Sequence, residues 1–523
     1  MTHDFNYLIL SDLHLQEADK DPAGRLFYFD QEFADLLRHY RLFSVAGRHW
    51  RLIIGGDFLE FFVIKEQPDP GDRLLRGTSL SASERRFFPG TEWQKSVWKL
   101  DLILRSHPQL LLALARFIGA GHEIYILRGN HDLELFWPQV QDHLRLLIAE
   151  HHPSDMSYLE VKEAAKARMH FPPWFYLEPG VLYVEHGHQY DEYCANAHNL
   201  APVLPGNRTQ IQLSMSAFTM RYFASRVQKV DPAAMENMNT LLRYIRHLVL
   251  NEPSLTLRLP AFYFEAAARI LRKAGRSDPR QEAFIEGAES VVREEIGRVY
   301  GLDGRTLQAL EALGRRPILL DRGRTGQGLW IDLILGSLAS AVTARLLARR
   351  GRPLAALGAL ATLSYWGLLW QRRIGRANDH RNLRVIARRI RDLLGVQYVV
   401  FGHSHDPDVE WLDAERDQVY FNVGTWLPTG GESQMIYLHI VRDRDRATAQ
   451  LMRWDRRRQA PLEVDPADYA IERRAELQGR QAAERAGTAS PASSASPGRS
   501  PAPGPWPPAP ASTPGGGAPP DAG

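Results

Sequence analysis

The chain has 523 residues, of which 24% are charged and 44% hydrophobic, and its formal net charge is +3. This length allows more than one domain, and the small net charge argues against a strong nucleic-acid binder. The single cysteine, Cys194, excludes an intramolecular disulfide framework. The N-terminal region has no basic segment followed by an apolar stretch, so we expect a cytoplasmic protein without a secretory signal.

Five short apolar runs predict buried strands, and each is followed by side chains of metal-binding type. The runs are residues 7–10, 52–54, 124–127, 182–184 and 398–401, rich in Ile, Leu, Val and Tyr. In open α/β sheets, ligands bind just beyond the carboxyl ends of the strands. We therefore expect an α/β fold in which one rim gathers Asp12, His14, Asp57, Asn130, His131, His186, His403 and His405.

Three further residues of these motifs have two readings each. His188 follows His186 by two residues and faces the same rim, where it either contacts a substrate or is a loop histidine satisfied by backbone. Glu60, in GDFLE, either supports the neighbouring ligands or caps a helix. Asp132, in GNHD, either orients His131 or caps the helix that begins there.

The interval between His186 and His403 is far longer than two successive strands require. Its apolar residues recur at three- and four-residue spacing, which predicts helices. We therefore expect a core in two parts, residues 1–188 and 381–470, separated by a helical insertion over 189–380. Further short strands are predicted in the second part, at 419–423, 435–440 and 449–454.

The insertion ends in an apolar hairpin, residues 329–370. Its second half, 353–370, is eighteen residues without a charge, which is the lower edge of a membrane span. A single crossing would put His186 and His403 on opposite sides of a bilayer. We expect peripheral association with an anionic membrane, at the cytoplasmic face of the inner membrane, because arginines cluster at the turn and exit of the hairpin. A hairpin buried on protein and a double crossing are the alternatives.

The C-terminal segment, residues 486–523, consists largely of Pro, Ala, Ser and Gly and contains no Val, Ile or Leu. Such a composition cannot bury enough apolar surface to fold. It predicts a disordered tail.

The motifs D-x-H, GD, GNHD, H and GHxH, in this order, resemble the calcineurin-like metallophosphoesterase superfamily over residues 5–188 and 396–455. The resemblance implies an αββα sandwich, with Asp57 bridging two divalent metal ions. It assigns Asp12, His14 and His405 to one ion, and Asn130, His186 and His403 to the other. The opening motifs also look like UDP-diacylglucosamine pyrophosphatases, but this chain has His131 where that group carries Arg, and a far larger insertion.

The resemblance implies hydrolysis of a phosphomonoester, phosphodiester or pyrophosphate bond by a hydroxide that bridges the two metals. His131 would protonate the leaving oxygen. Manganese is the first choice of metal, with iron or zinc as alternatives. The substrate would be lipid-linked or a nucleotide. A nuclease and a non-catalytic, metal-stabilised membrane scaffold are the competing functions; clustering of basic residues at the hairpin argues against the first, and the intact ligand set against the second.

Overall fold

The computed structural model describes most of the chain up to residue 465. The described residues are 5–17, 29–69, 71–223, 253–275, 279–352, 355, 357–358, 361–362, 365–369, 381–413, 417–427, 435–443 and 446–465. The predicted disordered tail at 486–523 lies outside them.

The first sheet has seven strands in the order β14-β13-β12-β1-β2-β3-β4. Strands β1 to β4 run parallel to one another. Strand β12 pairs with the other edge of β1 in the antiparallel sense, and β13 and β14 continue the sheet, each antiparallel to the strand before it. Their bounds are β1 (Phe5–Leu10), β2 (His49–Ile54), β3 (Glu123–Ile126), β4 (Met169–His170), β12 (Ile436–Asp443), β13 (Arg446–Asp455) and β14 (Ala460–Glu463).

The second sheet has five strands in the order β10-β11-β9-β6-β5. Its three central strands are parallel, and both edge strands are antiparallel to their neighbours. The bounds are β5 (Tyr176–Glu178), β6 (Leu182–Val184), β9 (Tyr398–Phe401), β10 (Asp408–Asp413) and β11 (Gln418–Asn422). All eight strands predicted from the apolar runs are therefore confirmed within two or three residues at their ends.

The side chains of β1 alternate between two hydrophobic cores, as the period of two in a strand requires. Tyr7 and Ile9 pack in a core that also contains Val184, Val400 and Phe421 of the second sheet. Leu8 and Leu10 point the other way, into a core shared with helices. The two sheets therefore face one another, and the predicted α/β class is confirmed.

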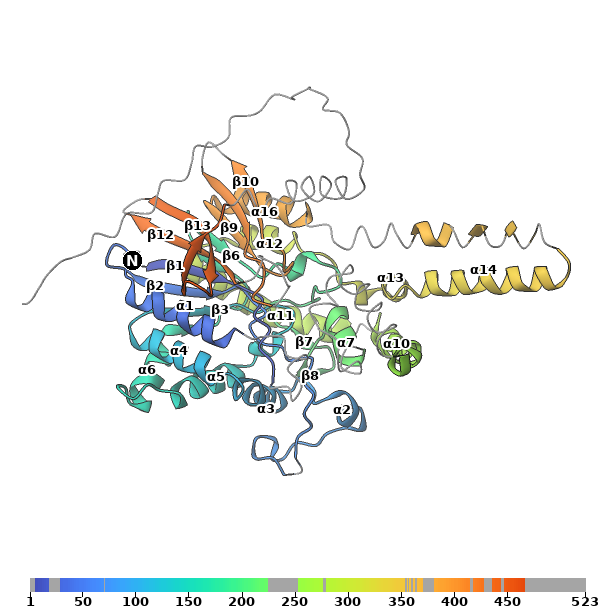
Figure 1. Cartoon of the computed structure of the whole chain (residues 1–523), viewed down its shortest axis with the longest axis horizontal. Coiled ribbons are helices and arrows are strands. Elements are labelled where there is room, and N and C mark those ends of the chain that lie inside the picture. The colour runs from blue at the N-terminus through green and yellow to red at the C-terminus, as the bar shows by residue number, and fades with distance from the viewer. Residues whose placement is uncertain are drawn as a thin grey trace, which may run out of the picture.

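Helices cover the outer face of each sheet (Figure 1). The core behind the first sheet contains residues of α1 (Asp30–Leu42), α3 (Trp93–Leu104), α4 (Pro108–Gly119), α5 (Pro138–Glu150) and α6 (Tyr158–Arg168). The core behind the second sheet contains residues of α11 (Pro279–Tyr300), α12 (Gly304–Glu311) and α16 (Arg381–Leu394). Two described insertion helices, α11 and α12, thus form part of the outer layer rather than a separate domain.

The rest of the described insertion is mostly helical, as expected, but it also holds a small antiparallel sheet that the sequence did not predict. Strands β7 (Val203–Leu204) and β8 (Asn207–Ile211) form this sheet. Its helices include α7 (Met215–Tyr222), α10 (Pro253–Lys273), α13 (Arg322–Gly328) and α14 (Ile331–Arg349). The remaining short helices of the described residues are η2 (Arg73–Leu75), α2 (Ala82–Phe87), η3 (Leu133–Phe136), η4 (His188–Tyr190) and η6 (Ile318–Leu320).

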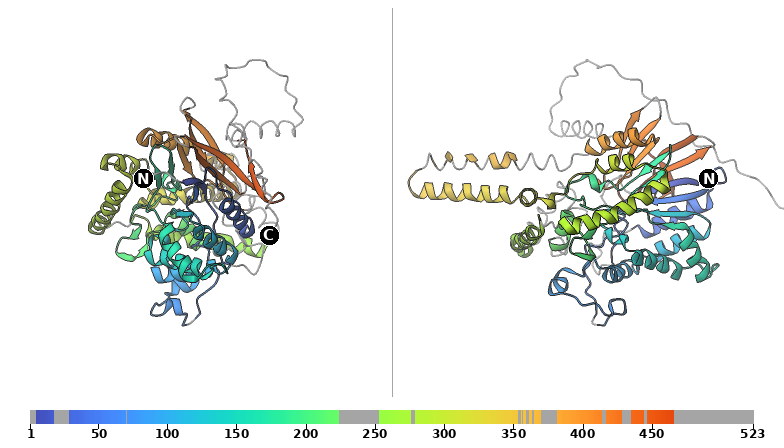
Figure 2. Two further views of the ribbon diagram at one scale, coloured as in Figure 1. Left: turned by 90° about the vertical axis from the view of Figure 1, so that its left-hand side faces the viewer. Right: turned by 180° about the vertical axis from the view of Figure 1, so that it is seen from behind.

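Helix α14 extends away from both sheets and their covering helices in two opposite views (Figures 1 and 2). A turn follows it at 350–352, and the described residues between 355 and 369 are helical. The indole of Trp366 lies against Gly336 of α14, and Thr362 donates to Ser340. The described helical residues between 355 and 369 therefore pack back along α14, so the described part of segment 329–370 is a helical hairpin.

Candidate metal centre

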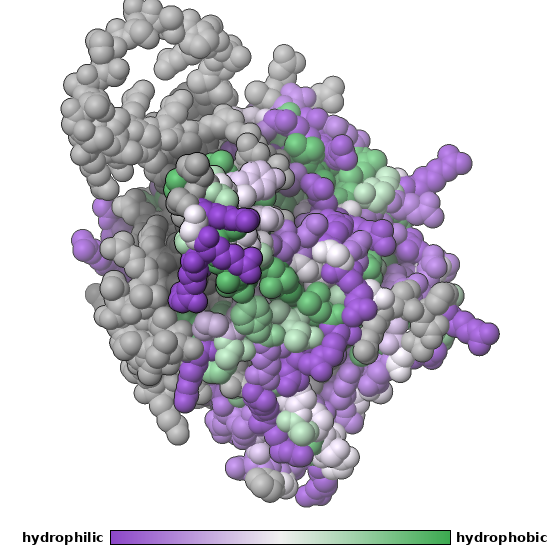
Figure 3. All heavy atoms as spheres, turned by 90° about the vertical axis from the view of Figure 1, so that its right-hand side faces the viewer, coloured by the Kyte–Doolittle hydropathy of each residue, from purple (hydrophilic) through white to green (hydrophobic). Residues whose placement is uncertain are grey.

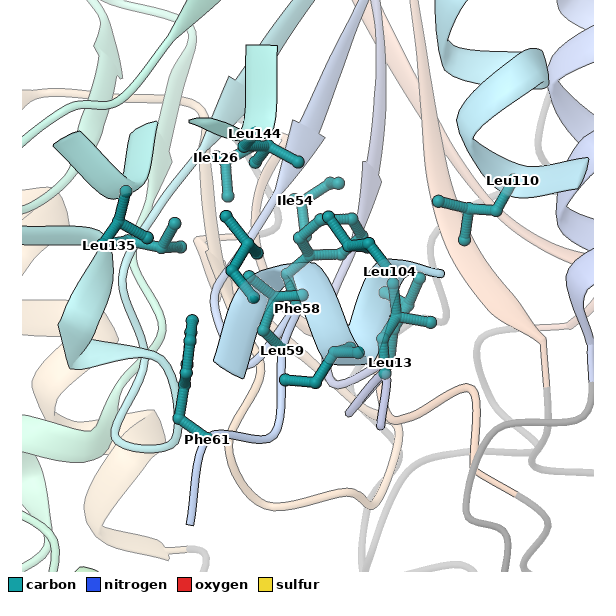
Figure 4. Packing of buried hydrophobic residues seen from close by; sticks show 14 of the residues in the cluster. Leu13, Ile54, Phe58, Leu59, Phe61, Leu104, Leu110, Ile126, Leu135 and Leu144 are labelled. Carbon is teal, nitrogen blue, oxygen red and sulfur yellow. The ribbon is translucent and has the colours of Figure 1, made fainter. Parts of the chain in front are cut away.

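The predicted ligand residues lie in loops that follow β1, β2, β3, β6 and β9, at the carboxyl ends of these strands. The loop after β2 shows how the sequence fixes their direction. Phe58, Leu59 and Phe61 turn into the hydrophobic core (Figure 4), while Asp57 is buried at the rim instead. The apolar residues that follow Asp57 thus anchor this loop and hold the carboxylate in place.

Five of the proposed ligands have backbone angles in the left-handed region. The φ angles are 57° for Asp12, 46° for His14, 49° for Asp57, 66° for His403 and 57° for His405. Such conformations are uncommon for residues other than glycine and cost free energy, so they persist only where the surroundings enforce them. Their concentration at this rim is typical of a functional site.

Three glycines let these loops approach one another. A Cβ atom on Gly129 would lie 2.0 Å from Asp57 Oδ1, and one on Gly56 would lie 2.6 Å from His186 Nδ1. A Cβ on Gly402 would lie 2.4 Å from Asp12 Oδ2. These glycines, in GGD, RGNH and FGH, are therefore needed for the close contact of the loops.

The first group of ligand atoms comes from the two ends of the described chain. His405 Nε2 lies 3.2 Å from Asp12 Oδ1 and 3.2 Å from His14 Nε2. His14 Nε2 lies 3.9 Å from Asp12 Oδ1. One ligand atom from each residue falls within 4.8 Å of the others, so this trio could hold one cation.

A second group adjoins the first and is centred on Asp57. The Asp57 Oδ2 atom lies 3.1 Å from His186 Nε2 and 3.7 Å from His14 Nε2. Asn130 Oδ1 lies 3.1 Å from the same nitrogen of His186. Asp57 therefore lies between residues that the family resemblance assigns to two different ions.

The donor set fits divalent cations. Asp12 Oδ1 and Asp57 Oδ2 are buried and accept no hydrogen bond of regular geometry, which is costly for a carboxylate unless another positive partner is bound. Burial alone would raise the pKa of the Asp57 carboxyl, but the imidazoles of His186 and His131 hold it well below its usual range. Burial opposes charge on His186 as well, yet Asp57 and Asp12 raise its pKa to about 9. The site thus favours positive charge beside its carboxylates.

His403 lies beside this cluster rather than within it. Its ring is 5.2 Å from that of His186, but its Nε2 atom lies 3.5 Å from Asp191 Oδ2. Its other nitrogen, Nδ1, is buried without a hydrogen-bond partner. Asp191 and Cys194 form a further group with His403 that the sequence analysis did not predict. A carboxylate that holds one ring nitrogen of a ligand histidine commonly orients the other toward a metal.

His131 lies at the rim with its backbone N–H donating to Asp57 Oδ1 at 2.8 Å. Its Nδ1 atom lies 2.6 Å from Glu60 Oε2, and the same oxygen lies 3.4 Å from His14 Nδ1. Burial would raise the pKa of Glu60, but His131 and His14 lower it to about 2. Glu60 therefore supports two neighbouring imidazoles of the site rather than capping a helix.

Asp132 takes neither of its predicted roles. Its carboxylate accepts hydrogen bonds from Gly129 N at 2.6 Å and Phe58 N at 2.8 Å, so it ties the GNHD loop to the GDF loop. The prediction that it orients His131 is wrong, because Glu60 occupies that position. It also makes no capping hydrogen bond at the start of η3. Burial, reinforced by Asp57, raises the pKa of Asp132 to about 7.

His188 is buried next to His186, with the two ring centres 5.4 Å apart. Its Nε2 atom lies 2.9 Å from Gln189 Nε2, whereas Nδ1 has no hydrogen-bond partner. The prediction of a loop histidine whose ring nitrogens bond to backbone groups is therefore wrong. Burial and the neighbouring His186 and His403 lower the pKa of His188 well below its usual range, which keeps the ring neutral at pH 7.

Comparison with known proteins gives no relative for this chain: no family model matches it, and no curated protein matches it significantly.

Proposed function

We propose that this protein is a metal-dependent phosphoesterase of the calcineurin-like metallophosphoesterase superfamily. One observation carries the proposal. Side chains from five strand ends, spread from Asp12 to His405, form a largely buried cluster of carboxylates and imidazoles around Asp57. His131 adjoins this cluster and is hydrogen-bonded to Glu60.

The arrangement of layers supports the same assignment. Two sheets share a hydrophobic core, and helices cover both outer faces. This layering agrees with the αββα sandwich that the sequence motifs imply. The ligand loops all leave the carboxyl ends of parallel strands, where α/β folds place their ligands.

Two divalent cations, with manganese as the first choice, would be held by the predicted ligands, of which all but His403 already lie within the cluster. Asp12, His14 and His405 would bind one, and Asn130, His186 and His403 the other, with Asp57 shared between them. When bound, the metals supply Lewis-acid stabilisation of phosphoryl oxygens and a more acidic water.

The protein's own residues would supply the proton for the leaving group. Glu60 bonds to Nδ1 of His131, and its charge favours the protonated imidazole. Nε2 is the opposite ring nitrogen and would donate its proton to the departing oxygen of the substrate. Because Glu60 also touches His14, it links the position of the proton donor to that of a metal ligand.

The test is a hydrolysis assay on purified protein supplied with manganese. The substrates are a nitrophenyl phosphate, an alkyl phosphate, a phosphodiester, a nucleotide diphosphate lipid and single-stranded DNA. His131→Gln should keep the bound metal and reduce turnover by about 10²–10⁴-fold, the usual contribution of a positioned proton donor. The reduction should be smaller for nitrophenyl phosphate, whose leaving group needs no proton.

His143→Gln is the matched control, because His143 pairs with Asp101 on the helical layer away from the rim. It should change neither metal content nor turnover. A metal-loaded wild-type protein that hydrolyses none of the phosphoesters would support the scaffold reading instead. Hydrolysis of DNA alone would support a nuclease.

A further inference from the structure

We propose that the hairpin formed by α14 and the helical residues up to 369 inserts into a lipid bilayer. The proposal is independent of the metal centre and of its proposed activity. It also goes beyond the surface association that the sequence favours, because it depends on which side chains lie between the two helices and which lie outside them.

Small and hydroxyl residues form the contact between the helices. Gly336, Ser340 and Ala344 are spaced by four and therefore share one face of α14. Ser340 Oγ accepts from Thr362 Oγ1 at 2.6 Å and from Trp366 Nε1 at 3.2 Å. A Cβ on Gly336 would lie 2.4 Å from the Trp366 indole, so the glycine allows the close approach.

Four large apolar residues of α14 lie on the opposite face, whereas Leu333 near its start is buried. Leu335, Leu338, Val342 and Leu346 follow a three- and four-residue spacing that turns them away from Gly336 and Ser340. Between 48% and 59% of each side chain is exposed. On the returning segment, Leu357, Tyr365 and Leu368 are likewise 56–61% exposed.

This distribution is the reverse of a water-soluble helical hairpin. A soluble pair buries its leucines between the helices and exposes small and polar residues. Helices packed in lipid do the opposite: small residues allow close contact, hydroxyls bond across the interface, and large apolar side chains face the acyl chains. The hairpin has the second arrangement, so its outer surface fits hydrocarbon rather than water.

The length of the hairpin fits a bilayer. Helix α14 has 19 residues, which corresponds to about 28 Å, against a hydrocarbon core of about 30 Å. The arginines at its far end, Arg345, Arg349, Arg350 and Arg352, would then reach the opposite headgroups, with Arg345 extending its side chain outward. Both ends of the hairpin stay on the side of the sheets, as the shared site of His186 and His403 requires.

The foot of the hairpin is tied to the loop beside the metal centre. Arg315 N donates to Gln189 O at 2.7 Å, and Ile318 N donates to Glu192 O at 2.9 Å. The Arg324 guanidinium pairs with the Glu192 carboxylate. Figure 3 views this side of the molecule and shows hydrophobic side chains gathered among hydrophilic ones. An inserted hairpin would therefore hold the loop between His186 and Asp191 near the membrane surface.

The experiment is flotation of the full-length protein with vesicles, followed by an alkaline carbonate wash. One set of vesicles is phosphatidylcholine alone, and the other includes phosphatidylglycerol. We expect the wild type to remain with both after the wash. Replacing the outer face (Leu335→Ser, Leu338→Ser, Val342→Ser and Leu346→Ser) should reduce the floating fraction at least tenfold, with unchanged circular dichroism and unchanged bound metal.

The matched control replaces four apolar residues that are exposed elsewhere, on α1, α6 and α11: Leu42→Ser, Leu159→Ser, Val291→Ser and Val299→Ser. Its flotation should equal that of the wild type. Binding only to anionic vesicles, with release by carbonate, would overturn insertion in favour of surface attachment. Protein that stays in solution without detergent and does not bind vesicles would also overturn insertion, whether it is a monomer or a dimer formed through the leucine face.

Discussion

Glu60 Oε2 lies 2.6 Å from Nδ1 of His131, with both side chains buried at the rim of the candidate metal centre. The carboxylate is ionised there, because His131 and His14 overcome the effect of burial on the Glu60 pKa. Its negative charge favours the protonated form of His131, the form that can donate a proton.

Glu60→Gln should therefore reduce turnover by about 10–100-fold, the usual effect of removing a partner that orients such a site. The alkaline limb of the pH–rate profile should move to lower pH, since His131 loses its proton more easily without the carboxylate. Glu123→Gln, at the opposite end of β3, should leave the profile unchanged. A variant with reduced turnover but an unmoved profile would show that Glu60 acts on the loop rather than on the imidazole charge.

Asp57→Asn removes the charge that faces both groups of imidazoles. Because Asp57 Oδ2 adjoins His186 and His14, we expect loss of most bound metal at either position while the fold is retained. Elemental analysis of the purified variant gives the metal content, and circular dichroism reports the fold. Asp101→Asn, a partly buried carboxylate on α3 paired with His143, is the control and should keep full metal content. Two equivalents of metal in Asp57→Asn would contradict the bridging position.

Gly129→Ala should disturb the same centre without touching a ligand. The added Cβ would meet Asp57 Oδ1 at 2.0 Å and the Asp57 backbone nitrogen at 2.6 Å. Either the GNHD loop or the Asp57 carboxylate must move, so metal affinity should fall at least tenfold, as measured by titration with a metal indicator. Gly287→Ala, on α11 with open space around it, should leave metal affinity unchanged and stabilise the helix by about 0.5–1 kcal/mol. Equal metal affinity in both variants would mean that the loop tolerates the methyl group.

Glu17 gives a pH dependence of stability that does not depend on the metals. Burial raises the pKa of this carboxyl from 4.5 to about 7, although the backbone N–H groups of Lys65 and Glu66 donate to it. Below about pH 4.5 the group is protonated in both folded and unfolded chains and does not lower the free energy of unfolding. As the pH rises from there through 7, the folded state resists ionisation and stability falls.

Glu17→Gln keeps an acceptor for the two backbone donors and removes this cost. It should stabilise the protein by about 1–3 kcal/mol at pH 8 and hardly at all at pH 4.5. Thermal unfolding midpoints at the two pH values measure the difference. Glu150→Gln, an exposed residue at the end of α5, should give the same shift at both. A stabilisation of Glu17→Gln that is equal at both pH values would rule out the linkage.

The sequence predicted best those features that depend on the apolar pattern of a single strand or on the residues at the end of that strand. Apolar runs located the central strands, and the rule that ligands follow parallel strands brought Asp12, Asp57 and His405 together. It could not place Asp191 beside His403, because that pairing depends on how the loop after β6 folds back on the GHSH loop. The helix-cap prediction for Asp132 was wrong, because its carboxylate accepts a hydrogen bond from Phe58 N instead. In the hairpin, composition revealed apolarity but not that Gly336 and Ser340 face the returning segment while Leu335, Leu338 and Leu346 are exposed.

The distance in sequence between His14 and His405, whose Nε2 atoms lie 3.2 Å apart, has a consequence for synthesis. The chain leaves the ribosome from its N-terminus, so Asp12, His14 and Asp57 emerge long before β9 and the GHSH loop. Until then the centre lacks two imidazoles, and a central strand of the second sheet is missing. If the site binds metal as proposed, uptake at full affinity must wait until translation has passed residue 405, and a nascent chain interrupted earlier would carry Asp12 and Asp57 without these imidazole partners.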